Sequence, residues 1–444
     1  MATVILPSHL ARQTGVDDRL EATGATIGEA LRSLERQQPA LRGWVLDERG
    51  RIREHVKVFR NRIDAGLEEP LAPDDELHVV QAISGGSGDP LELLVGTRKG
   101  LFVLRGERGG AMQVAHRDFV GQTVEYAVRD PRSGRCFASV THGQYGPRLF
   151  LADDAAGPWR QAGGPLFPED AEAAVSRIWI VRPGAEEGEL WAGVAPAALF
   201  HSRDDGESWT LNRGLWDQPT RSEWEGGLGG LALHSICPWP GDPRRVAVGI
   251  SAVGVWITED GGATWRNHHA GLVPRYLPEE AREGTLMHCV HKMERSPVEP
   301  ETLYMQFHGG VYRSDDGGAS WTDIGTDTGL PADFGFPLVV DPEDADRAWV
   351  IPLVADFDRV TPEGRLRVYE TRDRGATWRP RSAGLPQENA WATILRQAFC
   401  HDGRSPLGLC FGTEQGAVYV SGDRGESWAA AVEGLPPVVA VQAA

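Results

Sequence analysis

The sequence predicts a multi-domain chain that is mainly β, with a small α+β domain at its start and a β-propeller over the rest. Three observations predict this class. The 444 residues are more than one hydrophobic core usually holds. An octapeptide containing Asp, Gly and Trp recurs in the later part, and a Gly85–Gly86 pair precedes that part. We therefore expect a first domain over residues 1–86, a linker over 87–90 and a propeller over 91–444.

The first domain is predicted to contain one helix flanked by short strands. Strands are expected at Thr3–Leu6 and around Arg19–Ala22. Thr26 and Glu29 form a capping box at the start of a helix whose apolar residues recur on one face. Alternation in HVKVFRN and a last apolar run in ELHVVQAI predict two further strands. The order strand, strand, helix, strand, strand, with a protruding tail, favours a β-grasp fold.

The segment VKVFRN…GLEEPLAPDDELHVVQAISGG resembles the end of the MoaD/ThiS family of ubiquitin-like sulfur carriers, and the likeness covers nearly all of residues 2–86. In that family an activating enzyme adenylates the Gly-Gly carboxylate, which then becomes a thiocarboxylate that hands sulfur on. The resemblance implies a carrier tail at Gly85 and Gly86, with an activating enzyme as partner. Because Ser87 follows, a processing protease would have to release the carboxylate. The alternative is that the glycines are only a hinge.

After residue 87 the chain repeats the pattern S/T-x-D-x-G-x-S/T-W. Five good copies follow one another at periods of about 50 to 57 residues, after a worn copy, ADDAAGPW. They resemble the Asp boxes of sialidase-like and BNR-repeat β-propellers. We expect hairpin turns in which the Asp accepts backbone N–H bonds, the Gly takes a positive φ and the Trp packs between sheets. The Asp residues, which we interpret as structural and not catalytic, are Asp154, Asp204, Asp260, Asp316, Asp373 and Asp423.

Seven strand pairs predict seven blades. A pair such as LYMQFHGGVYRS precedes each octapeptide, and the pair LELLVGTRKGLFVLRG follows the Gly-Gly without one. The first pair has no apolar segment before it, whereas the last octapeptide is followed by a spare one, LPPVVAVQAA. The sequence therefore predicts a seven-bladed β-propeller whose C-terminal strand becomes the innermost strand of the first blade. Closing the ring in this way removes its open edges.

Polar side chains occupy the start of the predicted innermost strands, where an apolar residue is usual. The aligned segments are EYAVRDP, RIWIVRP, HSICPWP, HKMERSP, FPLVVDP and RQAFCHD. A slip of one residue in this alignment would turn a side chain away from the channel. The aligned positions are Glu125, Arg177, His234, His291, Phe336 and Arg396.

We interpret this ring as a polar pocket at the mouth of the channel. Loops are expected to bring further polar groups to the same rim: His142, His308, Asp356, Arg221, Glu223 and Asp333. The candidate metal ligands or general acid and base groups are His234, His291 and His308. Arg177 and Arg396 are candidates for binding an anion, with Glu125 as a further catalytic candidate. The alternative is a water-filled channel whose polar groups satisfy one another.

The leading hypothesis is a sulfur-carrier domain fused to a propeller that binds a small ligand or a protein. One alternative is a glycosidase-like hydrolase or lyase acting at the His/Arg ring, with the first domain as a docking module. Another makes both domains interaction modules. A sialidase needs three arginines, a Tyr nucleophile with a Glu partner and an Asp, and only Arg177 and Arg396 are candidates for the arginines. The residues imply no particular cofactor.

Composition narrows the partners and the compartment. The 45 Lys and Arg against 63 Asp and Glu give a formal charge of -18, which argues against nucleic acid and anionic membranes as partners. No apolar run is long enough to span a bilayer and the start lacks a signal peptide, so we expect a cytoplasmic protein. The five cysteines include no CxxC pair, which argues against a disulfide framework or a cysteine zinc site. Cys237 and Cys289 are expected to be small core residues.

Overall fold

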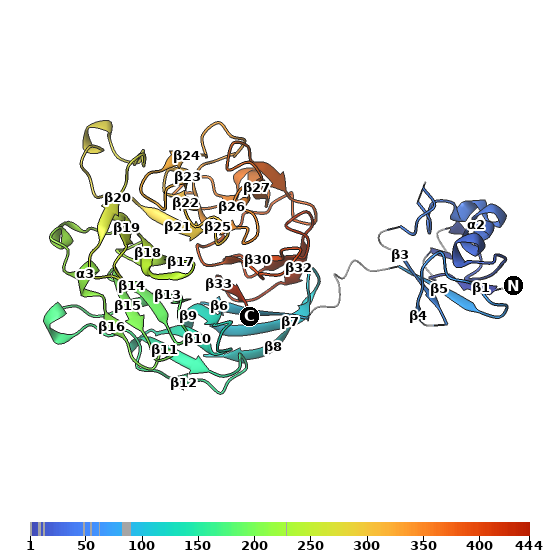
Figure 1. Ribbon diagram of the computed structural model, residues 1–444, viewed down its shortest axis with the longest axis horizontal. Coiled ribbons are helices and arrows are strands. Elements are labelled where there is room, and N and C mark those ends of the chain that lie inside the picture. The colour runs from blue at the N-terminus through green and yellow to red at the C-terminus, as the bar shows by residue number, and fades with distance from the viewer. Residues whose placement is uncertain are drawn as a thin grey trace. The chain divides into compact units, whose positions relative to one another are not determined.

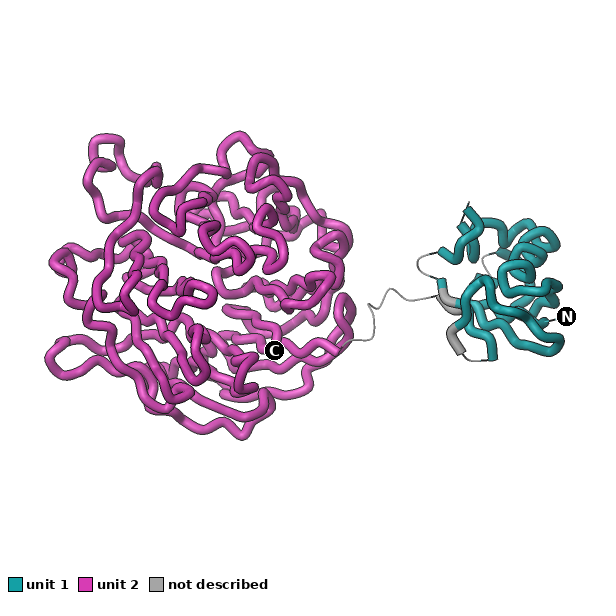
Figure 2. The backbone as a smooth tube through the Cα atoms, viewed as in Figure 1, with its two compact units in different colours: residues 1–85 teal, residues 86–444 magenta. Residues whose placement is uncertain are grey.

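A computed structural model gives the structure of the chain as two compact units, residues 1–85 and 86–444 (Figure 2). It describes residues 2–7, 10–11, 14–47, 49–53, 56–61, 63–81, 90–227 and 229–444. The predicted carrier tail, Gly85 and Gly86, lies outside the described residues, as does most of the predicted linker. Among the residues that are described, no helix is both long and apolar enough to cross a membrane.

The first unit is a five-stranded sheet with helix α2, the β-grasp arrangement that the order of elements predicts (Figure 1). Its sheet has the order β2-β1-β5-β3-β4, and β1 runs parallel to β5 while the other pairs are antiparallel. The elements are β1 (Ala2–Ile5), β2 (Arg19–Ala22), α2 (Ile27–Gln37), the 3-10 helix η1 (Pro39–Leu41), β3 (Val56–Arg60), β4 (Ile63–Asp64) and β5 (Glu76–Gln81).

Helix α2 begins where the capping box predicts. The Oγ1 of Thr26 accepts a hydrogen bond from the backbone N–H of Glu29 at 3.3 Å, and the Oε2 of Glu29 accepts one from the N–H of Ala25 at 2.7 Å. Behind this cap, Ile27 and Leu31 are buried in the core of the unit. The same few residues therefore fix both the start of the helix and the face that it turns to the sheet.

The second unit is a ring of four-stranded antiparallel sheets, a propeller-like architecture (Figure 1). From the axis outward, four of these sheets are β9 (Thr123–Arg129), β10 (Cys136–His142), β11 (Gly146–Ala152), β12 (Arg160–Gln161); β13 (Arg177–Pro183), β14 (Leu190–Ala195), β15 (Ala198–Ser202), β16 (Thr210–Leu211); β17 (Leu233–Trp239), β18 (Asp242–Ile250), β19 (Gly254–Thr258), β20 (Arg266–His268); and β21 (Val290–Arg295), β22 (Leu303–Phe307), β23 (Gly310–Ser314), β24 (Thr322–Asp323).

Three further sheets complete the ring. They are β25 (Gly335–Val340), β26 (Ala348–Pro352), β27 (Val368–Thr371), β28 (Arg379–Arg381); β29 (Phe399–His401), β30 (Leu409–Gly412), β31 (Val418–Ser421), β32 (Ala429–Val432); and β33 (Val438–Ala443), β6 (Pro90–Thr97), β7 (Gly100–Glu107), β8 (Met112–Asp118). Short helices interrupt the loops: α3 (Arg213–Trp216), η2 (Glu169–Ala171), η3 (Arg221–Glu223), η4 (Glu279–Ala281) and η5 (Pro362–Gly364).

The C-terminal strand closes the ring. Strand β33 pairs antiparallel with β6, the first strand of the unit, as the spare apolar segment predicts. The innermost strand of each sheet contacts that of the next sheet around the whole ring, with β29 and β9 on either side of β33. Val438, Ala440 and Val441 of β33 are fully buried. The two ends of this unit therefore depend on each other for their core.

The five good octapeptides form turns held by the Asp side chain. In one of them, Asp316 accepts a bond from Ser320 N–H at 2.9 Å and one from its hydroxyl at 2.6 Å. Gly318, at φ +103°, donates its N–H to the hydroxyl oxygen of Ser314 at 2.9 Å. Equivalent bonds hold the turns of Asp204, Asp260, Asp373 and Asp423. In the worn copy, Asp154 accepts a backbone N–H bond from Ala156 alone.

Two of the tryptophans that end the good octapeptides donate a hydrogen bond to the neighbouring sheet. Trp265 donates its indole N–H to the side chain of Asn212 at 2.9 Å, and Trp378 donates to the carbonyl of Ile324 at 2.8 Å. Each partner follows the outermost strands of the preceding sheet. The turns therefore join adjacent sheets, which supports the structural role expected for them.

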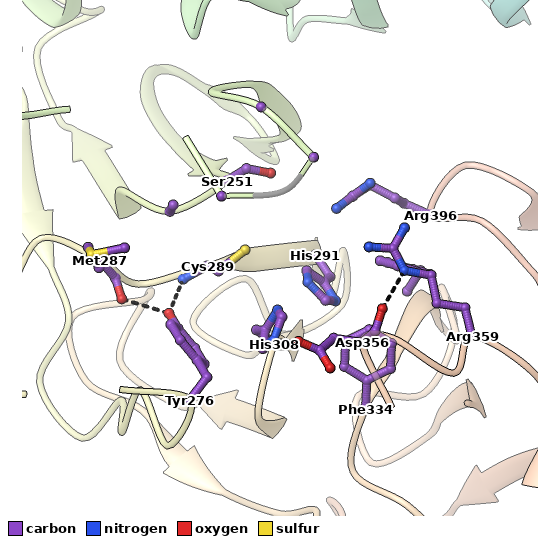
Figure 3. A pocket seen from close by; sticks show the side chains of 15 residues that line it. Ser251, Tyr276, Met287, Cys289, His291, His308, Phe334, Asp356, Arg359 and Arg396 are labelled. Atoms are coloured by element: carbon purple, nitrogen blue, oxygen red, sulfur yellow. Dashed lines mark hydrogen bonds and ion pairs between the residues drawn. The ribbon is translucent and has the colours of Figure 1, made fainter. Parts of the chain in front are cut away.

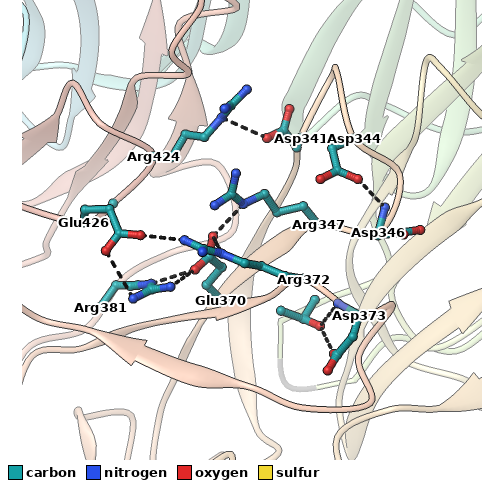
Figure 4. Close-up of polar contacts among 12 residues, drawn as sticks. Asp341, Asp344, Asp346, Arg347, Glu370, Arg372, Asp373, Arg381, Arg424 and Glu426 are labelled. Atoms are coloured by element: carbon teal, nitrogen blue, oxygen red, sulfur yellow. Dashed lines mark hydrogen bonds and ion pairs between the residues drawn. The ribbon is translucent and has the colours of Figure 1, made fainter.

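A buried carboxylate forms a second kind of link (Figure 4). Glu370 on β27 accepts hydrogen bonds from Arg347 and Arg381, each at 2.6 Å, and pairs with Arg372 at 3.0 Å. Its side chain is 1% exposed. Burial alone would raise the pKa of Glu370, but the bonds from the three arginines outweigh burial and hold the pKa below its usual range. Arg372 also contacts Glu426 in the turn of the next sheet, so this cluster connects two sheets.

Candidate functional site

A pocket of about 250 Å³ lies at the end of the ring where the innermost strands begin (Figure 3). His291 on β21 and Phe336 on β25 line it, together with Arg396 shortly before β29. The connecting loops add further lining residues: Tyr276, Met287, Cys289, His308, Phe334, Asp356 and Arg359. Three of the six aligned positions, His291, Phe336 and Arg396, therefore meet in one cavity, together with the predicted rim residues His308 and Asp356.

Innermost strands in six sheets carry an extra residue near their start, where the pairing register shifts. In five of these strands a single residue is left out of the ladder: Glu125 in β9, Trp179 in β13, His234 in β17, His291 in β21 and Val439 in β33. In β25 the extra residue is one of the two residues Phe336 and Pro337. A β-bulge bends its strand and re-aims the unpaired side chain, which is why bulges are common beside functional sites. The polar positions aligned in the sequence are mostly these bulged residues. In β13 the bulge falls on Trp179, two residues beyond Arg177.

His291 lies beside a backbone carbonyl, and His308 lies beside a carboxylate. The Nδ1 of His291 lies 2.6 Å from the carbonyl oxygen of Gly335, and the ring is 2% exposed. His308, in the turn after β22, has its Nε2 3.6 Å from a carboxylate oxygen of Asp356. The two imidazole rings are 5.1 Å apart, edge to face. Burial lowers the pKa of both histidines and so favours neutral imidazoles. Asp356 acts in the opposite direction on the pKa of His308, but burial has the larger effect.

Cys289 lines this pocket, which corrects the expectation that it is a core residue. It lies immediately before β21, and its Sγ and the ring nitrogens of His291 and His308 that face it are all within 4.8 Å of one another. Its backbone N–H donates to the Tyr276 hydroxyl at 2.8 Å, which in turn donates to the Met287 carbonyl at 2.6 Å. Cys237, by contrast, is buried in β17 as expected.

His234 lies outside this group. It is fully buried, with Nε2 2.8 Å from the Ser251 hydroxyl and Nδ1 3.3 Å from the Ser235 hydroxyl. Both ring nitrogens therefore have partners within the protein. The three groups brought together are Cys289, His291 and His308, where the sequence predicted His234 with the two histidines.

Arg396 is a half-buried cation in an aromatic setting. Its guanidinium carbon lies 5.4 Å from the ring centre of Trp179 and 4.9 Å from that of Phe336. Its Nε is buried without a hydrogen-bond partner, and among the described residues it forms no ion pair. Burial lowers the pKa of Arg396 to about 10, and Arg359 and Arg177 add to the local positive charge. Arg396 is thus suited to an anionic ligand entering the pocket.

Arg177 and Glu125 satisfy each other. The Nε of Arg177 lies 3.2 Å from Glu125 Oε1, and its guanidinium stacks over Trp179 at 4.6 Å. Neither residue is among those that line the pocket. For this pair the geometry matches the alternative of mutually satisfied polar groups at the channel mouth.

The other predicted rim residues divide between the pocket and local structure. Asp356 lines the pocket. His142 accepts the N–H of Gln144 in its own turn. Arg221 donates to the Ala197 carbonyl at 2.7 Å and packs on the rings of Trp216 and Trp224. Arg221 therefore has a structural role at the outer part of its sheet.

The opposite end of the channel holds a second pocket, of about 220 Å³. Lys292 reaches into the channel, with Nζ 2.8 Å from Gln397 Oε1 and 3.3 Å from Glu294 Oε1. Arg182, Arg295 and His401 also line this pocket. Lys292 and Glu294 neutralise each other, but Arg295, like Arg396, has a buried Nε without a hydrogen-bond partner, packs on an aromatic ring, that of Trp239, and forms no ion pair among the described residues.

The two units are similar to different known proteins. The model of the ThiS family matches residues 4–86. Small archaeal modifier protein 1 of Haloferax volcanii is 39% identical over 69 residues, which cover 15% of this chain and 79% of that protein. A crystal structure of the same protein aligns at 36% identity and a TM-score of 0.18, covering 19% of this chain and 98% of that one.

The second unit is similar to larger proteins. An oligoxyloglucan-reducing end-specific xyloglucanase of Emericella nidulans is 23% identical over 278 residues, which cover 59% of this chain and 28% of that enzyme. The crystal structure of an ancestral GH74 enzyme aligns at 15% identity with a TM-score of 0.46, covering 73% of this chain and 37% of that one. The chain thus spans about a third of the length of these relatives.

Proposed function

Because the first unit of this chain belongs to the ThiS family, we propose that it is a sulfur-carrier domain whose C-terminal carboxylate is released by cleavage after Gly86. The observation that carries this proposal is where the family match ends. It runs to residue 86, the second glycine of the pair, and Ser87 follows directly. An extended Gly-Gly end has no side chains, so it can enter the narrow active site of an adenylating enzyme.

Intact-mass analysis of the protein made in its native host tests this role. We expect a fragment corresponding to residues 1–86 and, in part of it, the mass increase caused by exchange of one carboxylate oxygen for sulfur. Gly86→Val should prevent both changes, whereas Ser87→Ala, just outside the tail, should not. A chain that stays uncut and never carries a thiocarboxylate contradicts the carrier role.

For the second unit we infer a seven-bladed propeller, with Asp boxes as its repeated turns, that binds an anionic small ligand or an acidic group of a partner. The sheet order and the pairing of β33 with β6 support the count of blades. The unpaired Arg396 in the pocket supports the anionic ligand. The activating enzyme and the protease remain the expected partners of the tail.

A hydrolase or lyase at the same pocket is the second candidate, and the pair His308–Asp356 favours it. A carboxylate beside an imidazole orients the ring and supports its action as a general base. A glycosidase of the usual kind needs two carboxyl groups at the bond that is cleaved, and Asp356 is the one acidic residue among the described lining residues. A substrate screen with wild type and His308→Asn tests this candidate, and loss of a detected activity in the variant would support it.

A further inference from the structure

Three metal-binding side chains converge in the pocket of the second unit. Cys289 and His291 are two residues apart at the start of β21, and His308 comes from the turn after β22. Their ligand atoms lie within 4.8 Å of one another, and the three side chains face a common space in Figure 3. One thiolate and two imidazoles are ligands that Zn²⁺ prefers.

We propose that Cys289, His291 and His308 bind one transition-metal ion of the Zn²⁺ class. Bonds of about 2.3 Å to sulfur and about 2.0 Å to nitrogen put the ligands of a tetrahedral ion about 3.5 Å apart. The three atoms now lie within 4.8 Å of one another, so binding an ion requires the side chains to close on it. This site is independent of the carrier role of the first unit.

The outer contact of His291 matches that of a metal ligand. A ligating histidine usually donates its other ring N–H to a carbonyl or a carboxylate, which fixes the tautomer. His291 has this contact through Nδ1 to the Gly335 carbonyl, whereas Nε2 of His308 lies 3.6 Å from Asp356, an ion-pair separation that is longer than a hydrogen bond. No other hydrogen bond of either ring is found within the described residues. One ring nitrogen of each histidine is therefore free to bind the ion.

Three protein ligands leave a fourth position that opens into the pocket. One thiolate offsets half of the charge of Zn²⁺, so the site keeps a net positive charge. Arg396, which lines the same pocket, adds a second positive charge. An anionic group is therefore the expected fourth ligand, consistent with catalytic sites that keep an open position.

Zinc binding by the purified full-length chain tests the proposal. After removal of bound metal with a chelator, Zn²⁺ is titrated against an indicator and the retained metal is measured by mass spectrometry. We expect about one ion per chain in the wild type, and Cys289→Ser and His308→Asn should each weaken binding by about tenfold or more. Cys237→Ser, a buried cysteine outside the pocket, should bind like the wild type.

Two further measurements separate loss of a ligand from loss of folding. Co²⁺ bound by a thiolate gives a charge-transfer absorption band, which should be present in the wild type and absent in Cys289→Ser. Circular dichroism should show that Cys289→Ser, which exchanges one sulfur for oxygen, keeps the native spectrum. The proposal is overturned if the wild type retains no zinc or if Cys289→Ser binds zinc as tightly. It is also overturned if His234→Asn abolishes binding while Cys289→Ser does not, because His234 would then be the third ligand.

Discussion

At the scale of single residues, Arg396 carries an unbalanced charge. It lies among aromatic rings with a buried Nε that has no partner. Arg396 is half-buried, and a partly desolvated charge without a counter-ion lowers the stability of the fold. The unliganded protein bears this cost, and an anion in the pocket offsets it. Ligand binding should therefore stabilise the second unit.

The first prediction concerns this residue. Arg396→Met should raise the thermal unfolding temperature of the unliganded protein or leave it unchanged, because a half-buried charge without a counter-ion gives way to an apolar chain. The stabilisation by added phosphate or small carboxylates, measured in the same unfolding experiment, should disappear. Arg177→Met, which breaks the pair with Glu125, should keep it. A large stabilisation by anions in Arg396→Met would contradict the assignment.

Sequence reasoning found part of the pocket. The aligned positions identify His291, Phe336 and Arg396, and the predicted rim loops identify His308 and Asp356. Cys289 is missed, because a single cysteine in an apolar segment is usually buried. The spacing of Cys289 and His291 was the available signal, since residues two apart in a strand share one face. His234 has the same repeat position as His291, yet it bonds to Ser251. Such pairing depends on neighbouring strands and has no signature in the local sequence.

At the scale of elements, the octapeptide turns should contribute different amounts to the free energy of unfolding, because their Asp side chains accept different numbers of hydrogen bonds. Asp316→Ala should lower the unfolding free energy by about 1 kcal/mol, because the backbone and hydroxyl bonds from Ser320 are lost. Asp154→Ala, in the worn copy with one backbone bond, should change it by less than about 0.5 kcal/mol. Thermal or denaturant unfolding of the two variants measures the difference, and equal effects would contradict the structural ranking.

The Glu370 cluster is the strongest link between elements. Glu370→Gln should lower the unfolding free energy by about 3 kcal/mol or more, because three arginines lose their buried counter-charge. Glu363→Gln, an exposed partner of Arg367, is the matched control, and its effect should stay below about 1 kcal/mol. Denaturant midpoints of the two variants test this contrast.

The effect of Glu370 should also depend on pH. Its pKa is lowered in the folded protein, so the unfolded state binds a proton first as the pH falls. The stability that it contributes is complete above the unfolded pKa of about 4.3 and is lost as the pH drops through the folded pKa below that value. The difference between wild type and Glu370→Gln should therefore be constant from pH 7 to about pH 5 and shrink at lower pH.

At the scale of the whole molecule, the ring depends on its last strand. Deleting residues 438–444 removes β33 and the buried Val438, Ala440 and Val441. We expect loss of the folded second unit, because each fully buried valine contributes about 1.5 to 3 kcal/mol and the neighbouring strands lose their partner. Removing Ala444 alone should be tolerated. Soluble yield and thermal unfolding measure both, and a cooperative unfolding transition at the wild-type temperature in the longer deletion would contradict this account.

Large-scale features were the easiest to predict from sequence. The capping box at Thr26 and Glu29 located helix α2, and the unmatched segment LPPVVAVQAA located the closing strand. These signals are local patterns or a count of repeats. The bulges were beyond prediction, because an extra residue in a strand is defined only by the partner strand that it fails to pair with.

The bulged positions also bear on which side chains the rim of the channel displays. A residue outside the ladder leaves the flanking strand pairing in place when it is replaced, because the ladder does not pass through it. Glu125, Trp179, His234 and His291 already differ in charge and size on equivalent backbones. The repeated bulge therefore presents a different side chain at the same place in successive sheets, so the strand framework is separate from the chemistry displayed at the rim of the channel.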